Sequence, residues 1–69
     1  MPIVREINGQ KSKMIDVSTL IIYWSDDSTA MEFADVSFVE VEGRYYIYDN
    51  NRRFIVNSAL VKYIDFIVV

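Results

Sequence analysis

The sequence predicts an all-β domain, built as a small antiparallel β-barrel or a strongly bent sheet of five to six strands, SH3-like or Sm-like in size. Three observations support this fold class. The apolar stretches are short and rich in Val, Ile, Phe and Tyr. Turn-forming residues separate them at intervals of about 8 to 12 residues, as in small all-β domains. No window of eleven or more residues keeps a helical period well.

The length of the chain limits the number of domains that it can form. Its 69 residues predict a single domain, residues 1–69, because so short a chain encloses only one small core. The sequence contains no cysteine and no histidine, which removes disulfides, zinc sites and haem ligation from consideration. We therefore expect no cofactor, and self-association is the remaining way to supplement the stability of so small a core.

The strands and turns follow one another along the chain. Turns are expected where Asn, Asp, Ser and Gly gather, at residues 8–12, 25–28, 34–37, 42–44 and 49–53, with a weaker one at 57–60. The strands expected between them cover residues 3–7, 19–24, 29–33, 38–42, 45–49, 53–56 and 61–69.

Three hairpins fix the expected register. A four-residue loop at 25–28 pairs Leu20 with Phe33, Ile22 with Met31 and Trp24 with Thr29. A three-residue loop with Gly43 in the left-handed region pairs Val41 with Tyr45 and Val39 with Ile47. A two-residue loop, Asn50-Asn51, pairs Ile47 with Phe54 and Tyr45 with Val56.

This register divides the apolar residues between two faces of the sheet. The expected core is Leu20, Ile22, Met31, Phe33, Val39, Val41, Ile47, Phe54, Ile64 and Phe66, and the same parity places Val68 inside. The outward positions include a second apolar stripe: Ile21, Tyr23, Phe38, Tyr46, Tyr48, Ile55, Tyr63 and Ile67. Three explanations compete for this stripe: cover by loops or the N-terminal segment, a protein interface, or a platform for stacking bases.

A short repeat recurs along the chain. "DVS" introduces an apolar run at residue 16 and again at residue 35, and Val61 begins a similar run. We interpret Val17, Val36 and Val61 as plugs at corners where one strand turns into the next.

Catalysis has little support in the sequence. There is no histidine base, no cysteine nucleophile and no glycine-rich phosphate loop, so we expect a protein that is not an enzyme. Asp26 and Asp27 form the densest acidic spot, which is typical of a solvated turn, and calcium is the only metal worth testing there. We expect no catalytic, cofactor-binding or metal site.

Nucleic acid is the alternative partner. Small β-barrels bind single strands by stacking bases on aromatic side chains, and the residues for this role are Arg44, Tyr46, Tyr48, Arg52 and Arg53. Glu40 and Glu42 on the neighbouring strand oppose phosphate, and a cross-strand pair of Asp49 with Arg52 is the simpler reading of that arginine. With a net charge of −3, nucleic acid is a less favoured partner than protein.

The preferred hypothesis is a protein-interaction or regulatory module, acting through the aromatic and acidic outward face as a homo-oligomer, most simply a dimer. The terminal run "YIDFIVV" supports self-pairing, because so apolar a strand should be paired. A small acidic inhibitor from a mobile element is a further alternative. The start of the chain lacks the pattern of a signal peptide, and no apolar run reaches the ~18 residues of a membrane span, so we expect a cytoplasmic protein without a membrane partner.

Overall fold

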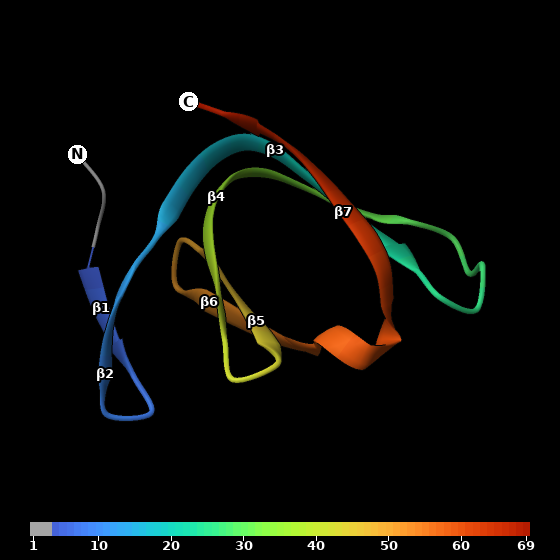
Figure 1. The fold of residues 1–69 in the computed structure, drawn as a ribbon. Helices are drawn as coiled ribbons and strands as arrows, with labels where there is room; N and C mark the ends of the chain where they lie inside the picture. The colour runs from blue at the N-terminus through green and yellow to red at the C-terminus, as the bar shows by residue number, and fades with distance from the viewer. Residues whose placement is uncertain (1–3) are drawn as a thin grey trace.

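The computed structural model describes residues 4–69, so Ile3, with which the first expected strand begins, lies outside the described part. Within it the chain forms seven strands and one short 3-10 helix (Figure 1). The strands are β1 (Val4–Ile7), β2 (Gln10–Lys13), β3 (Ile15–Trp24), β4 (Met31–Val41), β5 (Arg44–Asp49), β6 (Arg52–Asn57) and β7 (Val61–Val68), and the helix η1 (Ser58–Leu60) precedes β7. The all-β class is confirmed, with more strands than the five to six expected.

The strands form two antiparallel sheets. β1 and β2 form a hairpin, and the other five strands form a sheet in the order β6-β5-β4-β3-β7. The chain meanders from β3 to β6, and η1 then carries it back so that β7 pairs with β3. β6 and β7 are the two edges of this sheet, and no ladder joins them within residues 4–69. Figure 1 shows β3 and β4 as long arcs, which bend the sheet around its inner face.

The two "DVS" segments lie opposite each other in the β3–β4 ladder. Val17 pairs with Val36 and Asp16 pairs with Ser37, whose hydroxyl donates a hydrogen bond to the Asp16 carboxylate. Val17 and Leu20 are successive buried residues on β3, and Phe33 and Val36 are successive buried residues on β4. In each strand two residues separate the buried pair, where regular alternation would allow only one. The alternation of inward and outward side chains therefore breaks in both strands at the same point. Asp35, with φ of 54°, provides the left-handed residue in β4. Because both strands break together, the pairing continues in one register on either side.

The expected role of these valines as plugs is therefore modified. The bend at Val17 and Val36 lies within two long strands and not between successive strands, and a register shift between β3 and β7 occurs beside it, between Val17 and Thr19. Val61 is half-buried and begins β7 directly after η1, so it alone lies where one element turns into the next.

The β4–β5 hairpin differs from the expected register by one residue. Val41 pairs with Arg44, so the turn is the two residues Glu42 and Gly43, with φ of 52° and 78°. Positive φ at both central residues defines a type I′ turn, whose twist matches that of the flanking strands. As a consequence Phe38, and not Val39, pairs with Ile47 on the inner face.

The other hairpins agree with the sequence to different degrees. In β3–β4, Leu20 pairs with Phe33 and Ile22 with Met31 as expected, but the ladder stops there, so Trp24 and Thr29 are not partners. The Asn50-Asn51 turn and its Ile47–Phe54, Tyr45–Val56 and Asp49–Arg52 partners are confirmed. Residues 8–12, expected as a turn alone, instead contain the Asn8-Gly9 turn and most of β2.

The core consists of two clusters on opposite faces of the larger sheet. The inner cluster contains Val17, Leu20, Ile22, Phe33, Val36, Phe38 and Ile47, with Phe54 and Ile64 packed against it. The second cluster contains Ile7, Met14, Val41 and Tyr46, with Val39 and Tyr48 beside it, and it joins the β1–β2 hairpin to the outer face of β4 and β5. Met31 and Phe66, expected in the core, are 42% and 39% exposed.

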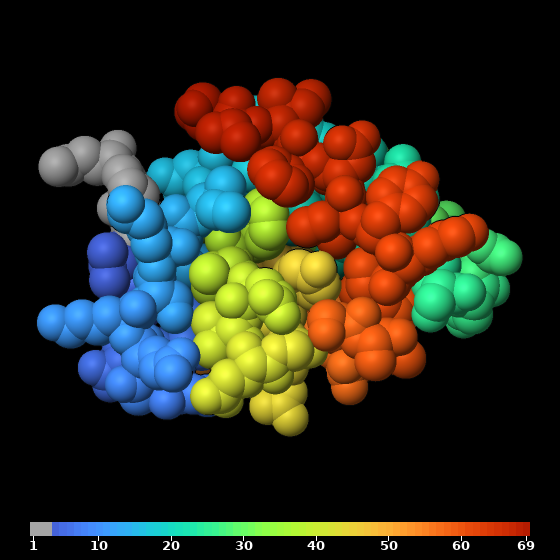
Figure 2. Space-filling model, in the orientation of Figure 1, coloured from blue at the N-terminus to red at the C-terminus, as the bar shows by residue number. Residues whose placement is uncertain are grey.

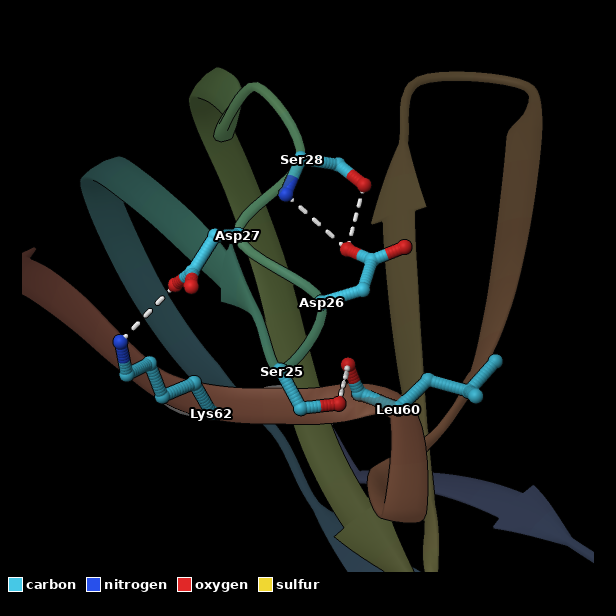
Figure 3. A network of polar contacts seen from close by, with 6 residues as sticks. All are labelled: Ser25, Asp26, Asp27, Ser28, Leu60 and Lys62. Atoms are coloured by element: carbon cyan, nitrogen blue, oxygen red, sulfur yellow. Dashed lines mark hydrogen bonds and ion pairs between the residues drawn. The ribbon is translucent and has the colours of Figure 1, made fainter.

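Polar contacts join the tip of the β3–β4 hairpin to η1 and to the start of β7 (Figure 3). The Ser25 N–H and hydroxyl both donate to the Leu60 carbonyl, at 3.0 and 3.1 Å. Lys62 Nζ lies 3.0 Å from Asp27 Oδ1. These contacts hold the start of β7 against the tip of β3. Among residues 4–69, no helix is long and apolar enough to span a membrane.

Candidate interaction surface

The outer face of the larger sheet is divided into a covered half and an uncovered half. The covered half carries Val39, Val41, Tyr46 and Tyr48, on which the β1–β2 hairpin lies. Two polar contacts fix the hairpin there: Asn8 Nδ2 donates to the Tyr46 hydroxyl at 3.0 Å, and the Arg5 guanidinium lies 4.1 Å from the centre of the Tyr48 ring. The hairpin thus covers Tyr46 and Tyr48 of the outward apolar stripe, together with Val39 and Val41.

The uncovered half is formed by β3 and β7. We call Ile21, Tyr23, Tyr63 and Ile67 the outer strip. Tyr23 pairs with Tyr63, and Thr19 and Ile21 pair with Ile67 and Asp65, so direct opposition in the ladder places these side chains on one face. The rings of Tyr23 and Tyr63 stack with their centres 4.4 Å apart. Tyr63 is 54% exposed and Ile67 61% exposed, whereas Ile21 and Tyr23 on β3 are half-buried, so the exposed part of the strip lies on β7.

One acidic residue lies within the outer strip and another lies beside it. Ile21 lies between Asp65 on β7 and Glu32 on β4, and both carboxylates are on exposed residues. Lys62, on the same strand as Asp65, is held by Asp27. Asp65 lies between Tyr63 and Ile67 on β7, and Glu32 lies beside the strip on β4, so the strip is an apolar, aromatic surface that carries negative charge.

The free edge of β7 adjoins the strip. β7 pairs with β3 on one side only, and within residues 4–69 no strand pairs with its other side. Its inner face also reaches solvent, because Phe66 and Val68 are exposed, although Phe66 contacts the Phe38 ring at a centre distance of 5.1 Å. An edge that exposes apolar side chains on both of its faces is unusual, because unpaired strands are normally protected by charge or cover.

The structure brings together half of the residues predicted for a protein interface. Ile21, Tyr23, Tyr63 and Ile67 form the outer strip, while Ile55 is exposed on the opposite edge strand, β6. Phe38 is buried on the inner face because the alternation of β4 breaks between Phe33 and Val36, and Tyr46 is buried beneath the hairpin. Tyr48 is half-buried under Arg5. For Tyr46 and Tyr48, cover by the N-terminal segment explains the outward aromatic residues.

The surface also includes residues that the sequence placed elsewhere. Phe66 and Val68 were expected in the core by their parity, but at the sheet edge the inner face of β7 is open. The sequence carries a signal for this open face. In a strand with only one buried face, apolar and polar residues alternate, whereas the last strand of this chain has apolar residues on both of its faces.

The residues considered for nucleic acid do not form a continuous platform. Tyr46 is 4% exposed, and Arg5 occupies one face of the Tyr48 ring. Arg44 pairs with Asn57 at one end of the β5–β6 ladder, whereas Arg52 and Arg53 lie at the other. The three arginines thus lie at the two ends of the ladder, and the tyrosine rings between them are already covered by the β1–β2 hairpin.

The acidic turn uses its two carboxylates separately. The Asp26 carboxylate accepts hydrogen bonds from the Ser28 hydroxyl and from the Ser28 N–H, the latter at 2.9 Å, whereas Asp27 turns toward Lys62 (Figure 3). These hydrogen bonds, that of the Ser28 hydroxyl above all, lower the pKa of Asp26 below its ordinary value. Within residues 4–69, no group of three or more Asp or Glu side chains is arranged to hold a metal ion.

Comparisons with known proteins were made at three levels. No family model, curated protein or solved structure matches this chain. The outer strip and the edge of β7 are therefore the features from which a function is argued.

Proposed function

We propose that this chain is a non-enzymatic protein-interaction module whose docking surface is the outer strip together with the free edge of β7. The observation that carries the proposal is the uncovered outer strip, with Tyr63 and Ile67 both more than half exposed beside an unpaired strand edge. The equivalent apolar half of the same face is covered by the chain's own hairpin.

The residue types favour a protein partner over other ligands. Tyrosine and isoleucine add contact area at low cost in conformational entropy, and tyrosine is enriched in protein interfaces. A free strand edge adds backbone hydrogen bonds when an extended segment joins it, which is a common way for proteins to bind each other. Asp65 and Glu32 disfavour a polyanion and leave the strip available to protein side chains.

A matched pair of substitutions tests the proposal. Ile67 and Ile55 are both exposed isoleucines on edge strands, on β7 and β6 respectively. Ile67→Asp places a charge in the proposed interface, and Ile55→Asp places the same charge outside it. The tagged chain is immobilised and offered a cell extract together with a labelled, untagged copy of itself.

The expected result is that association through this surface weakens by about tenfold or more in Ile67→Asp, which corresponds to ~1.4 kcal/mol, and is unchanged in Ile55→Asp. Circular dichroism of both variants verifies that they remain folded. Equal capture by the two variants and the unsubstituted chain would show that the outer strip is not a docking surface.

A further inference from the structure

We infer that the partner on this surface is a second copy of the chain, joined antiparallel along the free edges of the two β7 strands with Ile64 opposite the partner's Ile64. This inference rests on the proposed function and specifies its partner. It starts from the two faces of β7, because Tyr63 and Ile67 are exposed on the outer face while Phe66 and Val68 are exposed on the inner face. An added strand covers Tyr63, Phe66 and Ile67 at once, and Val68 lies next to the paired residues at the end of β7.

A second copy of β7 has the composition that this edge requires. Its apolar residues lie at both odd and even positions, so they point to both the outer and the inner face of the sheet. The joined edges would form one continuous sheet and protect both strands from further pairing. A two-fold axis makes the contact self-complementary and limits assembly to two copies.

The geometry of an antiparallel pair restricts the register. Residues directly opposite each other point to the same face, so a two-fold axis perpendicular to the sheet must pass beside a residue and its own counterpart. An axis at Ile64 pairs residues 61–67 with each other, and an axis at Asp65 pairs residues 62–68. Any other centre leaves more of the strand unpaired.

Charge selects between these two registers. An axis at Asp65 places two like carboxylates directly opposite, which is destabilising in an antiparallel pair. An axis at Ile64 places Asp65 opposite the partner's Tyr63 and joins two isoleucines at the centre. Lys62 then faces the partner's Phe66, so no like charges oppose each other directly.

Cysteine cross-linking tests this register. The chain has no cysteine of its own, so any disulfide reports the introduced position. Under mild oxidation Ile64→Cys should form a covalent dimer, because opposite residues of an antiparallel pair lie within disulfide reach at ~5.5 Å or less between Cα atoms. Asp65→Cys alone should not cross-link efficiently.

A second cross-link covers the possibility that Ile64→Cys, being half-buried, lowers stability. Tyr63→Cys and Asp65→Cys are both at exposed positions, and a mixture of the two chains should form the mixed disulfide in preference to either homodimer. Light scattering on the unsubstituted chain at low micromolar concentration should give twice the chain mass, and Ile67→Asp should give the monomer mass.

The outcomes separate this inference from the proposed function. A dimer that cross-links through Asp65→Cys alone would overturn the register. A monomer mass would overturn the second copy as partner. If the monomer's capture of another protein is still lost in Ile67→Asp, the docking surface stands with a different partner. If Ile67→Asp changes neither mass nor capture, both proposals fall.

Discussion

Asp35 carries the bend of β4 at the level of a single residue. Its φ of 54° lies in the left-handed region, where aspartate is tolerated and β-branched residues are strained. Asp35→Val should lower the free energy of unfolding by about 1 to 3 kcal/mol, and Asp35→Gly should remain within about 1 kcal/mol of the unsubstituted chain. Urea denaturation gives both values.

Glu32→Val is the control for Asp35→Val, because Glu32 is also exposed on β4 but is not among the residues with positive φ. It should be close to neutral. Equal destabilisation by the two valines would mean that the bend does not depend on the conformation of residue 35.

Phe33 and Met31 were both expected in the core, and the structure separates them. Phe33 is 8% exposed and its ring lies 5.2 Å from that of Phe54, whereas Met31 is 42% exposed where β4 begins. Phe33→Ala should cost about 3 to 5 kcal/mol, enough to unfold a small domain, and Met31→Ala less than about 1 kcal/mol. Similar losses in thermal or urea denaturation would contradict this burial pattern.

Asp26 provides a prediction about pH. The Ser28 hydroxyl and N–H hold its pKa below the ordinary value, so removing the hydroxyl by Ser28→Ala should raise that pKa. The sign follows from linkage: a carboxylate whose pKa is lower in the folded state stabilises the fold above the ordinary pKa of Asp, and this contribution is lost as the pH falls through the lowered value. An NMR titration of the Asp26 carboxyl carbon in both proteins measures the shift. An Asp26 pKa that is the same in both proteins would contradict the assignment.

At the level of elements, the sequence predicts strand content better than register. β-branched and aromatic runs predict the strands because such side chains fit a pleated, half-buried surface. The Leu20–Phe33 and Ile22–Met31 pairs follow from alternation alone. The β4–β5 register could not be predicted in this way, because a three-residue loop and a two-residue turn at Gly43 each align apolar residues, and nothing in the sequence marks Glu42 as having positive φ.

Two further features depend on tertiary structure. The break in alternation at Val17 and Val36 is stable because it occurs in both strands at once, which a pattern read from one strand does not reveal. The β1–β2 hairpin was missed because Gln10–Lys13 is polar, although Asn8-Gly9 is a strong hairpin sequence. As a result Ile7, Met14 and the burial of Tyr46 were not predicted, whereas the four residues of the outer strip were named correctly as outward.

At the level of the whole molecule, the distribution of charge and cover predicts weak binding to nucleic acid. Tyr46 is buried, and Glu40 and Glu42 are exposed at the end of the β4–β5 hairpin that carries Arg44. Fluorescence anisotropy with a mixed single-stranded oligonucleotide at physiological salt should show only weak, nonspecific binding. Binding with a sub-micromolar dissociation constant that rises steeply with salt, and loss of this binding in Arg52→Glu, would favour nucleic acid over protein as the partner.

The β1–β2 hairpin determines how much of the outer apolar face is available to bind another molecule. By covering Val39, Val41, Tyr46 and Tyr48 it leaves one uncovered apolar half on the outer face of the sheet, so under the proposed pairing of β7 this face has valence one, and units of valence one stop growing at pairs. Ile7→Asp, which places a charge in the buried contact of the hairpin, should expose that second side and give valence two. Units of valence two form open chains, so dynamic light scattering should show particles that grow with concentration. In the proposed dimer, the N-terminal hairpin would therefore be the part of the monomer that ends assembly at two copies.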